Sequence, residues 1–112
     1  MWLFTTLGFH SVVQHRDNAG QVFIRARFKD DLVRLCRRFT IPEDSVLDTP
    51  DADYGYRIAI PKKQRIEIAR SLAESVDYDN FKTAAHSGDR VKDGALLQIW
   101  RVMRKAQKQK GI

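Results

Sequence analysis

Two groups of aspartates are the first candidates for a chemical role in this chain. Asp48, Asp51 and Asp53 lie close together, and Asp77 and Asp79 form a second group. Paired carboxylates can hold Mg²⁺ for phosphodiester hydrolysis, which would make the protein a metal-dependent nuclease. Aspartates also cap helices and form turns, and neither group has a His, Lys or Arg partner that would define a mechanism. We therefore assign no catalytic residue, no metal ligand and no cofactor.

The histidines and the single cysteine offer no better catalytic site. His10, His15 and His86 lack the HxH or HxxxH spacing that would direct two nitrogens at one metal ion. Cys36 lies on the apolar side of an expected helix, where a small core residue is the simpler interpretation. A lone cysteine cannot form an internal disulfide, so we expect a reducing compartment, the cytoplasm. Sequences of the GxSxG, GxGxxG and phosphate-loop types are absent.

Arginines interleaved with aromatic residues point to binding rather than catalysis. Apolar residues in the 22–28 segment alternate with Phe23, Arg25 and Arg27. This period of two is typical of a strand with one buried and one exposed face. We expect the three side chains to share the exposed face, joined by Arg57 from a later strand. Such a surface could stack bases and bind phosphates.

The positive charge is concentrated in the second half of the chain. The 112 residues include 20 Lys and Arg against 14 Asp and Glu, a net charge of +6. Residues 1–56 have a net charge of −1, and residues 57–112 have a net charge of +7. Further residues that we expect to bind nucleic acid or another acidic partner are Lys62, Lys63, Arg65, Arg101, Arg104, Lys105 and Lys108.

Strands and helices must position these side chains. Residues 1–15, interrupted at Gly8, and residues 22–28 predict a β-hairpin around the turn at 16–20. Asp30 can cap a helix that Pro42 ends, an acidic loop follows at 41–53, and a third strand spans about 54–60.

Two further helices, with a short helical turn between them, complete the predicted order β-β-α-β-α-α. Pro61 can start a helix whose buried stripe would be Ile66, Ala69, Leu72, Ala73 and Val76. Asp79 could cap a short helical turn, and a last helix covers about 93–107. We expect an α+β fold in one domain, 1–112, with a small antiparallel sheet and helices on one face, a split or permuted relative of the ferredoxin-like sandwich. The basic tail at 101–112 is expected to fray.

We expect large aromatic residues to form the core between the sheet and the helices. Their burial would contribute strongly to a core formed by Trp2, Phe4, Phe9, Tyr56, Phe81 and Trp100. The apolar stretch at 1–13 is too short to span a bilayer, so we expect no membrane partner. An exposed strand edge makes a homodimer a reasonable expectation.

Several sequence motifs run through nearly the whole chain. They are MW-x-FT-x-x-GF-x-SVV at the start, the arginine-bearing 22–27 strand, DY-x-YR at 53–57, DY-x-NFK at 77–82 and W-x-VM at 100–103. Together they resemble a group of small uncharacterised bacterial and phage proteins. The chain departs from that group at His10, where its members often have an aromatic residue, and in its basic tail. The resemblance implies a context of bacteria, phages and mobile elements, without catalytic residues.

Within those motifs, packing alone does not account for Asp53, Arg57, Asp77 and Lys82. An Arg57–Asp77 ion pair could lock the strand to the helix end, or the four could line a ligand cleft. The preferred interpretation is a small non-enzymatic binding module that contacts nucleic acid or a nucleoprotein complex. The alternatives are a phage or mobile-element counter-defence inhibitor, similar to an anti-CRISPR protein, and the metal-dependent nuclease.

Overall fold

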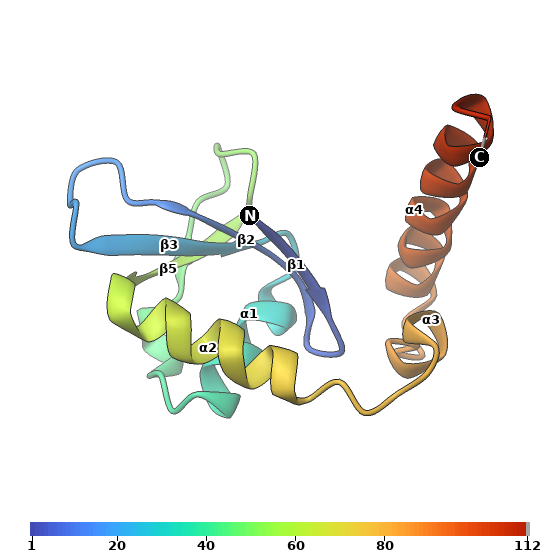
Figure 1. Cartoon of the computed structure of the whole chain (residues 1–112). Coiled ribbons are helices and arrows are strands. Elements are labelled where there is room, and N and C mark those ends of the chain that lie inside the picture. Colours follow the sequence, from blue (N-terminus) through green and yellow to red (C-terminus); the bar gives the residue numbers. More distant parts are fainter. Residues whose placement is uncertain (112) are drawn as a thin grey trace. The chain divides into compact units, whose positions relative to one another are not determined.

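The computed structural model describes residues 1–111 and contains one sheet and four α-helices (Figure 1). The strands are β1 (Trp2–Thr5), β2 (Gly8–Gln14), β3 (Gln21–Ala26), β4 (Leu47–Asp48) and β5 (Tyr56–Pro61). The helices are α1 (Lys29–Arg38), α2 (Lys62–Glu74), α3 (Phe81–Ala84) and α4 (Arg90–Gln109), with a 3-10 turn, η1, at Glu43–Ser45.

All neighbouring strands are antiparallel, in the order β1-β2-β3-β5-β4. The predicted α+β class with a small antiparallel sheet is therefore confirmed. The segment expected as one interrupted strand is itself a hairpin, because the chain turns at Thr6 and Leu7 between β1 and β2. Gly8 follows this turn with a φ of 126°, a backbone conformation that favours glycine.

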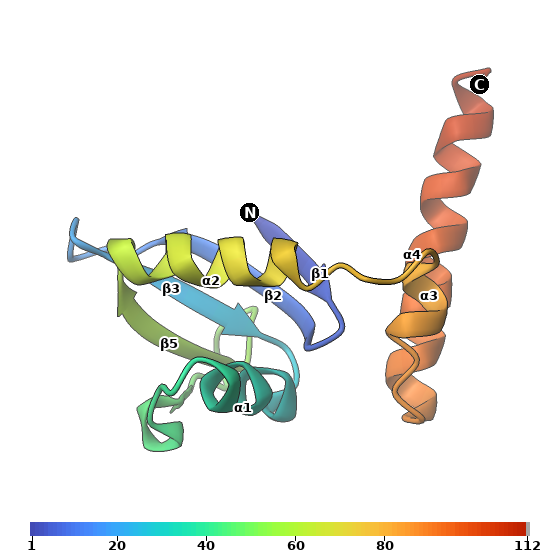
Figure 2. The same cartoon turned by 60° about the horizontal axis from the view of Figure 1, so that its bottom comes forward.

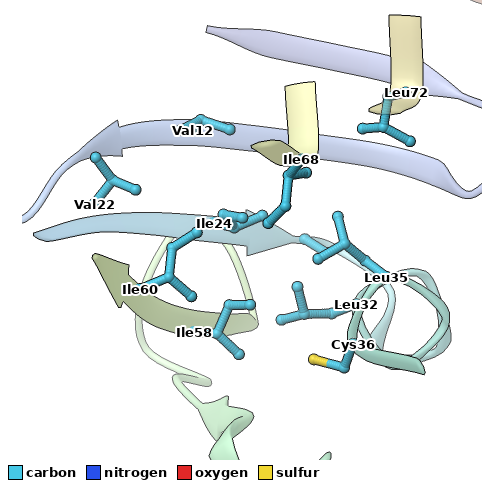
Figure 3. Close-up of a cluster of buried hydrophobic side chains, with 11 residues drawn as sticks. Val12, Val22, Ile24, Leu32, Leu35, Cys36, Ile58, Ile60, Ile68 and Leu72 are labelled. Atoms are coloured by element: carbon cyan, nitrogen blue, oxygen red, sulfur yellow. The ribbon is translucent and has the colours of Figure 1, made fainter. Parts of the chain in front are cut away.

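The core lies between α1, α2 and one face of the sheet, which we call the aliphatic face (Figures 1 and 2). Alternate residues of β2, β3 and β5 point toward these helices, and β-branched side chains fill the space between them (Figure 3). The buried cluster consists of Val12, Val22, Ile24, Ala26, Leu32, Leu35, Cys36, Ile58, Ile60, Ile68 and Leu72. Burial raises the pKa of the Cys36 thiol, which agrees with its expected place in the core.

The expected aromatic core is wrong for the first hairpin. Trp2 is 73% exposed, and Phe4 and Phe9 are only partly buried. The β1–β2 register pairs Trp2 with Ser11 and Phe4 with Phe9, which directs these side chains away from α1 and α2. Tyr56 does pack against the aliphatic core.

The buried stripe of α2 also differs from the prediction. Ile68 and Leu72 are buried, whereas Ile66 is 61% exposed and Val76 is 56% exposed. Residues four apart share a helix face, while Ile66 lies two positions before Ile68 and so points roughly 200° away. The sequence pattern identified the helix but placed its inner face incorrectly.

The helix starts also differ from the predicted caps. Asp30 is not the N-cap of α1, because Phe28 holds that position without a side-chain hydrogen bond. At α3 the cap is Asn80 rather than Asp79, and its side-chain oxygen accepts a hydrogen bond from the Thr83 N–H at 3.1 Å. Each acidic residue proposed as a cap lies one or two positions from the residue that holds the helix boundary.

The chain divides into two compact units, which we call the sheet unit (Met1–Asp77) and the helical unit (from Tyr78 onward). The expectation of a single domain stays a prediction. The basic tail is helical as far as Gln109, within α4, and its fraying stays a prediction; residue 112 lies outside the described residues.

Candidate functional site

The second face of the sheet carries the predicted arginines, and we call it the arginine face. In the β3–β5 register, Arg25 lies directly opposite Arg57, and Phe23 lies opposite Ala59. Directly opposite residues of an antiparallel pair point to the same side. Phe23, Arg25 and Arg57 therefore share the face that points away from the aliphatic core, as their alternation predicts.

A single row of side chains crosses four strands of this face. Trp2 of β1 lies opposite Ser11 of β2, Ser11 lies opposite Arg25 of β3, and Arg25 lies opposite Arg57 of β5. Arg25 donates a hydrogen bond from Nη2 to Ser11 Oγ at 3.0 Å. This bond ties Arg25 to the neighbouring strand and reduces its freedom on the surface.

Tyr54 organises one end of the arginine face. It lies in the loop before β5 and is almost completely buried. Its ring centre is 4.4 Å from the Arg25 guanidinium carbon and 4.1 Å from that of Arg27, so both cations stack on it. Arg27 is also paired with Asp53 at 3.2 Å, and this hydrogen-bonded pairing raises the pKa of Arg27. This role of Tyr54 was not predicted from the sequence, where the DY-x-YR motif was the available signal.

Phe23 organises the other end. The imidazole ring of His15 stacks on it, with 4.2 Å between ring centres and 22° between ring planes. The guanidinium carbon of Arg57 lies 5.3 Å from the Phe23 ring centre. Aromatic contacts therefore support both arginines at the centre of the face without neutralising their charge.

Arg25 and Arg57 form no ion pair with any carboxylate in residues 1–111, unlike Arg27. The Nε atom of each is buried and has no hydrogen-bond partner. Two like charges directly opposite each other on neighbouring strands are unfavourable. A bound anion would relieve this repulsion, which makes the pair the strongest candidate binding element in the sheet unit.

The other predicted basic residues do not join this row. Lys62, Lys63 and Arg65 belong to α2, which packs on the aliphatic face. Four more belong to α4, in the helical unit: Arg101, Arg104, Lys105 and Lys108. The sheet arginines and the α2 cations are therefore on opposite sides of the sheet, although both were expected in one binding surface.

The predicted Arg57–Asp77 ion pair is wrong: within the described chain these residues do not form one. Arg57 lies on the arginine face, while Asp77 follows α2 on the opposite side of the sheet. Asp53 pairs with Arg27 instead. Lys82 belongs to the helical unit, where its ammonium lies 4.3 Å from the Trp100 ring centre.

Helix α4 carries a second concentration of positive charge. Its only acidic residue, Asp93, lies in the first turn and accepts hydrogen bonds from the backbone N–H groups of Ser87 and Gly88. These bonds, above all the one from Ser87, lower the pKa of Asp93. From Gly94 to Gly111 the sequence has basic residues and no acidic ones. Such a run attracts anions through its overall field.

A buried polar cluster, which no sequence pattern indicated, ties the first hairpin to α1. The buried carboxylate of Asp31 accepts hydrogen bonds from the Phe9 N–H at 3.2 Å and from Arg34 Nη2 at 2.6 Å. His10 is fully buried, and its Nε2 donates to the Asp31 carbonyl at 2.9 Å, since a carbonyl can only accept. A Cβ at Gly8 would lie 2.3 Å from the Asp31 carboxyl carbon. This cluster joins distant segments and has a structural role.

Burial lowers the pKa of His10 below its usual 6.5. Its Nδ1 is buried without a hydrogen-bond partner. Burial therefore favours the neutral imidazole, in contrast to the charged arginines on the other face of the sheet.

The aspartates considered for a nuclease are not part of a larger cluster of metal-ligating side chains within residues 1–111. Among residues 1–111 there is no group of three His, Cys, Asp or Glu side chains that could hold a metal ion. Asp48 pairs with Lys29 at 3.8 Å, and Asp53 pairs with Arg27.

Among residues 1–111, no helix is long and apolar enough to cross a membrane.

Comparisons with known proteins add no family to this description: no family model, curated protein or solved structure matches the chain. The resemblance to small bacterial and phage proteins therefore stays a prediction.

Proposed function

We propose that the protein is a small non-enzymatic binding module that contacts nucleic acid, alone or in a nucleoprotein complex, through its arginine face. The observation that carries this proposal is the Arg25–Arg57 pair, two arginines directly opposite each other on β3 and β5 that form no ion pair with a carboxylate in residues 1–111. Phosphate groups match the planar donor arrangement of arginine and would neutralise both charges.

The surroundings of the pair favour a nucleic acid over a simple inorganic anion. Phe23 is partly exposed and stacks against Arg57, and Trp2, which is largely exposed, lies in the same row as Arg57. Aromatic side chains beside cations can contact bases as well as phosphates. The basic residues of α4 add a sequence-independent attraction for the same class of ligand.

Charge removal on the two sides of the sheet tests the proposal. In fluorescence-polarisation titrations with short labelled oligonucleotides, the double variant Arg25→Gln/Arg57→Gln should bind more weakly than the unmodified protein. The slope of log affinity against log salt should become shallower by about 0.7 for each phosphate that the variant no longer neutralises. The double variant Lys62→Gln/Lys63→Gln removes the same charge from α2 and is the matched control.

Equal reductions of affinity in the two double variants would show that only net charge matters and would contradict binding through the arginine face. Absence of binding to single- or double-stranded DNA and RNA at low salt would overturn the proposed function altogether. Circular dichroism of both variants establishes that they are folded.

A further inference from the structure

We propose that the arginine face prefers unpaired nucleic-acid strands, with a base stacked on Trp2 and the adjoining phosphates bound by Arg25 and Arg57. This inference rests on the proposed function and narrows its ligand from nucleic acid in general to a single strand. It is based on the observed position of Trp2, which we expected in the core because the residue is large and apolar.

The indole ring of Trp2 is largely exposed on the arginine face, and neighbouring aromatic rings hold it in place. It is 73% exposed, although it belongs to a strand. Its ring meets that of Phe9 edge to face, with 5.7 Å between centres and 63° between planes. Phe4 contacts the same Phe9 ring at 5.3 Å. These contacts hold the indole in place while leaving ring surface available for stacking.

The sheet register places this ring in line with Arg25 and Arg57, which have no carboxylate partner among the described residues. Neighbouring strands are about 4.8 Å apart, so Trp2 is roughly 10 Å from Arg25 and roughly 14 Å from Arg57 at the backbone. Ser11, the residue between Trp2 and Arg25, is small and buried. No bulky side chain within the row therefore separates the stacking surface from the phosphate-binding groups.

Whether its bases are paired determines whether a nucleic acid can contact both Trp2 and the two arginines. In a duplex the faces of the bases are covered by their neighbours, so a duplex could reach the arginines with its phosphates but could not stack on Trp2. An unpaired strand can use both contacts at once. We therefore expect selectivity for single strands to depend on Trp2 and phosphate affinity to depend on the arginines.

A second copy of the chain is a less suitable partner for this face. Two arginine faces placed against each other would bring four unneutralised guanidinium groups together. An anionic ligand removes this charge repulsion, whereas a second copy doubles it.

The test compares Trp2→Ala with the unmodified protein on a labelled oligothymidine and on a duplex of equal length. Stacking contributes about 1–3 kcal/mol per base, so we expect roughly a 5- to 150-fold loss of affinity for the single strand. Duplex affinity should change by less than about twofold, because the phosphate contacts remain. Ile66→Ala, which truncates an exposed apolar residue of α2, is the matched control and should change neither affinity.

A fluorescence measurement gives an independent readout. In a Trp100→Phe background Trp2 is the only tryptophan, and its emission should be quenched when oligothymidine binds. Absence of quenching would overturn the stacking proposal.

Three other results separate this inference from the proposed function. Equal binding of single strand and duplex, unchanged in Trp2→Ala, would overturn the preference for single strands and leave the nucleic-acid function standing. Loss of a dimer in Trp2→Ala by analytical ultracentrifugation, without a change in oligonucleotide affinity, would assign Trp2 to self-association and also overturn the inference. Absence of binding to every oligonucleotide would overturn both.

Discussion

Along β3, side chains that are neighbours in sequence enter two different environments. Val22 and Ile24 point toward α1 and α2 and are buried, whereas Phe23 and Arg25 point to the arginine face and remain partly exposed. The aliphatic face is closed by two helices and is filled by β-branched and leucine side chains. The arginine face instead carries aromatic rings and cations that stack on one another.

This difference shows which property matters on each side. On the aliphatic face, side-chain volume determines stability, because a missing methyl group leaves a cavity. On the arginine face, folding does not require the charges or the exposed aromatic rings. Two residues of like charge, Arg25 and Arg57, even lie directly opposite each other, which is unfavourable for stability. Substitutions on the two faces should therefore change the free energy of unfolding by different amounts.

The largest effect is expected in the core. Leu35→Ala removes a fully buried side chain of α1 and should lower the free energy of unfolding by about 2–5 kcal/mol, measured by urea denaturation. Ile66→Ala, at an exposed position on α2, should change it by less than about 0.5 kcal/mol. Similar losses in the two variants would contradict the assignment of the inner helix faces.

The next effect concerns the link between the first hairpin and α1. Gly8→Ala forces a side chain into a φ of 126° and against the Asp31 carboxylate. We expect a loss of about 1–3 kcal/mol in the free energy of unfolding, measured by urea denaturation. Gly94→Ala is the matched control and should be neutral or stabilising, by up to about 1 kcal/mol, since it lies in α4 with open space around it. A loss at Gly94 as large as that at Gly8 would contradict a specific role for the Gly8–Asp31 contact.

A smaller effect should appear on acidification, because His10 is buried on the aliphatic side. Its pKa is lowered in the folded protein, so the unfolded chain takes up the proton near pH 6.5 while the folded chain stays neutral. The unfolded state then binds more protons, and stability falls as the pH drops from 6.5 toward the folded pKa. Denaturation curves at several pH values would measure this slope. His10→Gln should abolish it, and the exposed His86→Gln should retain it.

The smallest effect is expected on the arginine face. Arg57→Gln removes one of two opposed charges and should raise the free energy of unfolding by a few tenths of a kcal/mol, up to about 1. Chemical denaturation at low salt measures this change, and high salt should reduce it. A decrease of more than about 2 kcal/mol would make Arg57 a structural residue and would weaken its proposed role in binding.

Much of the local structure could be predicted because its signals lie within a few residues. The alternation around Arg25 indicated the β3 strand and the face on which Phe23 and Arg25 lie, since side chains alternate with a period of two. Asn80 and Asp89 were less predictable as caps because several nearby polar residues could serve equally well.

Other features could not be predicted because they depend on register or on distant residues. Trp2 was assigned to the core because it is large and apolar, yet the position of the turn at Thr6 and Leu7 sends it to the arginine face. The contact of Gly8 with Asp31 joins segments that are far apart in the chain. No periodic pattern can show such a pairing.

Composition and short-range periodicity were enough to establish the α+β class, the uneven charge and the arginine-bearing strand. The folded chain was needed to show that Arg25 lies opposite Arg57 and that neither is paired with a carboxylate in the part of the chain that the structure describes. It was also needed to show that Tyr54 supports Arg25 and that Trp2 lies in the same row. Strand register and loop position bring these residues together, and both follow from long-range pairing between strands and from how the core closes.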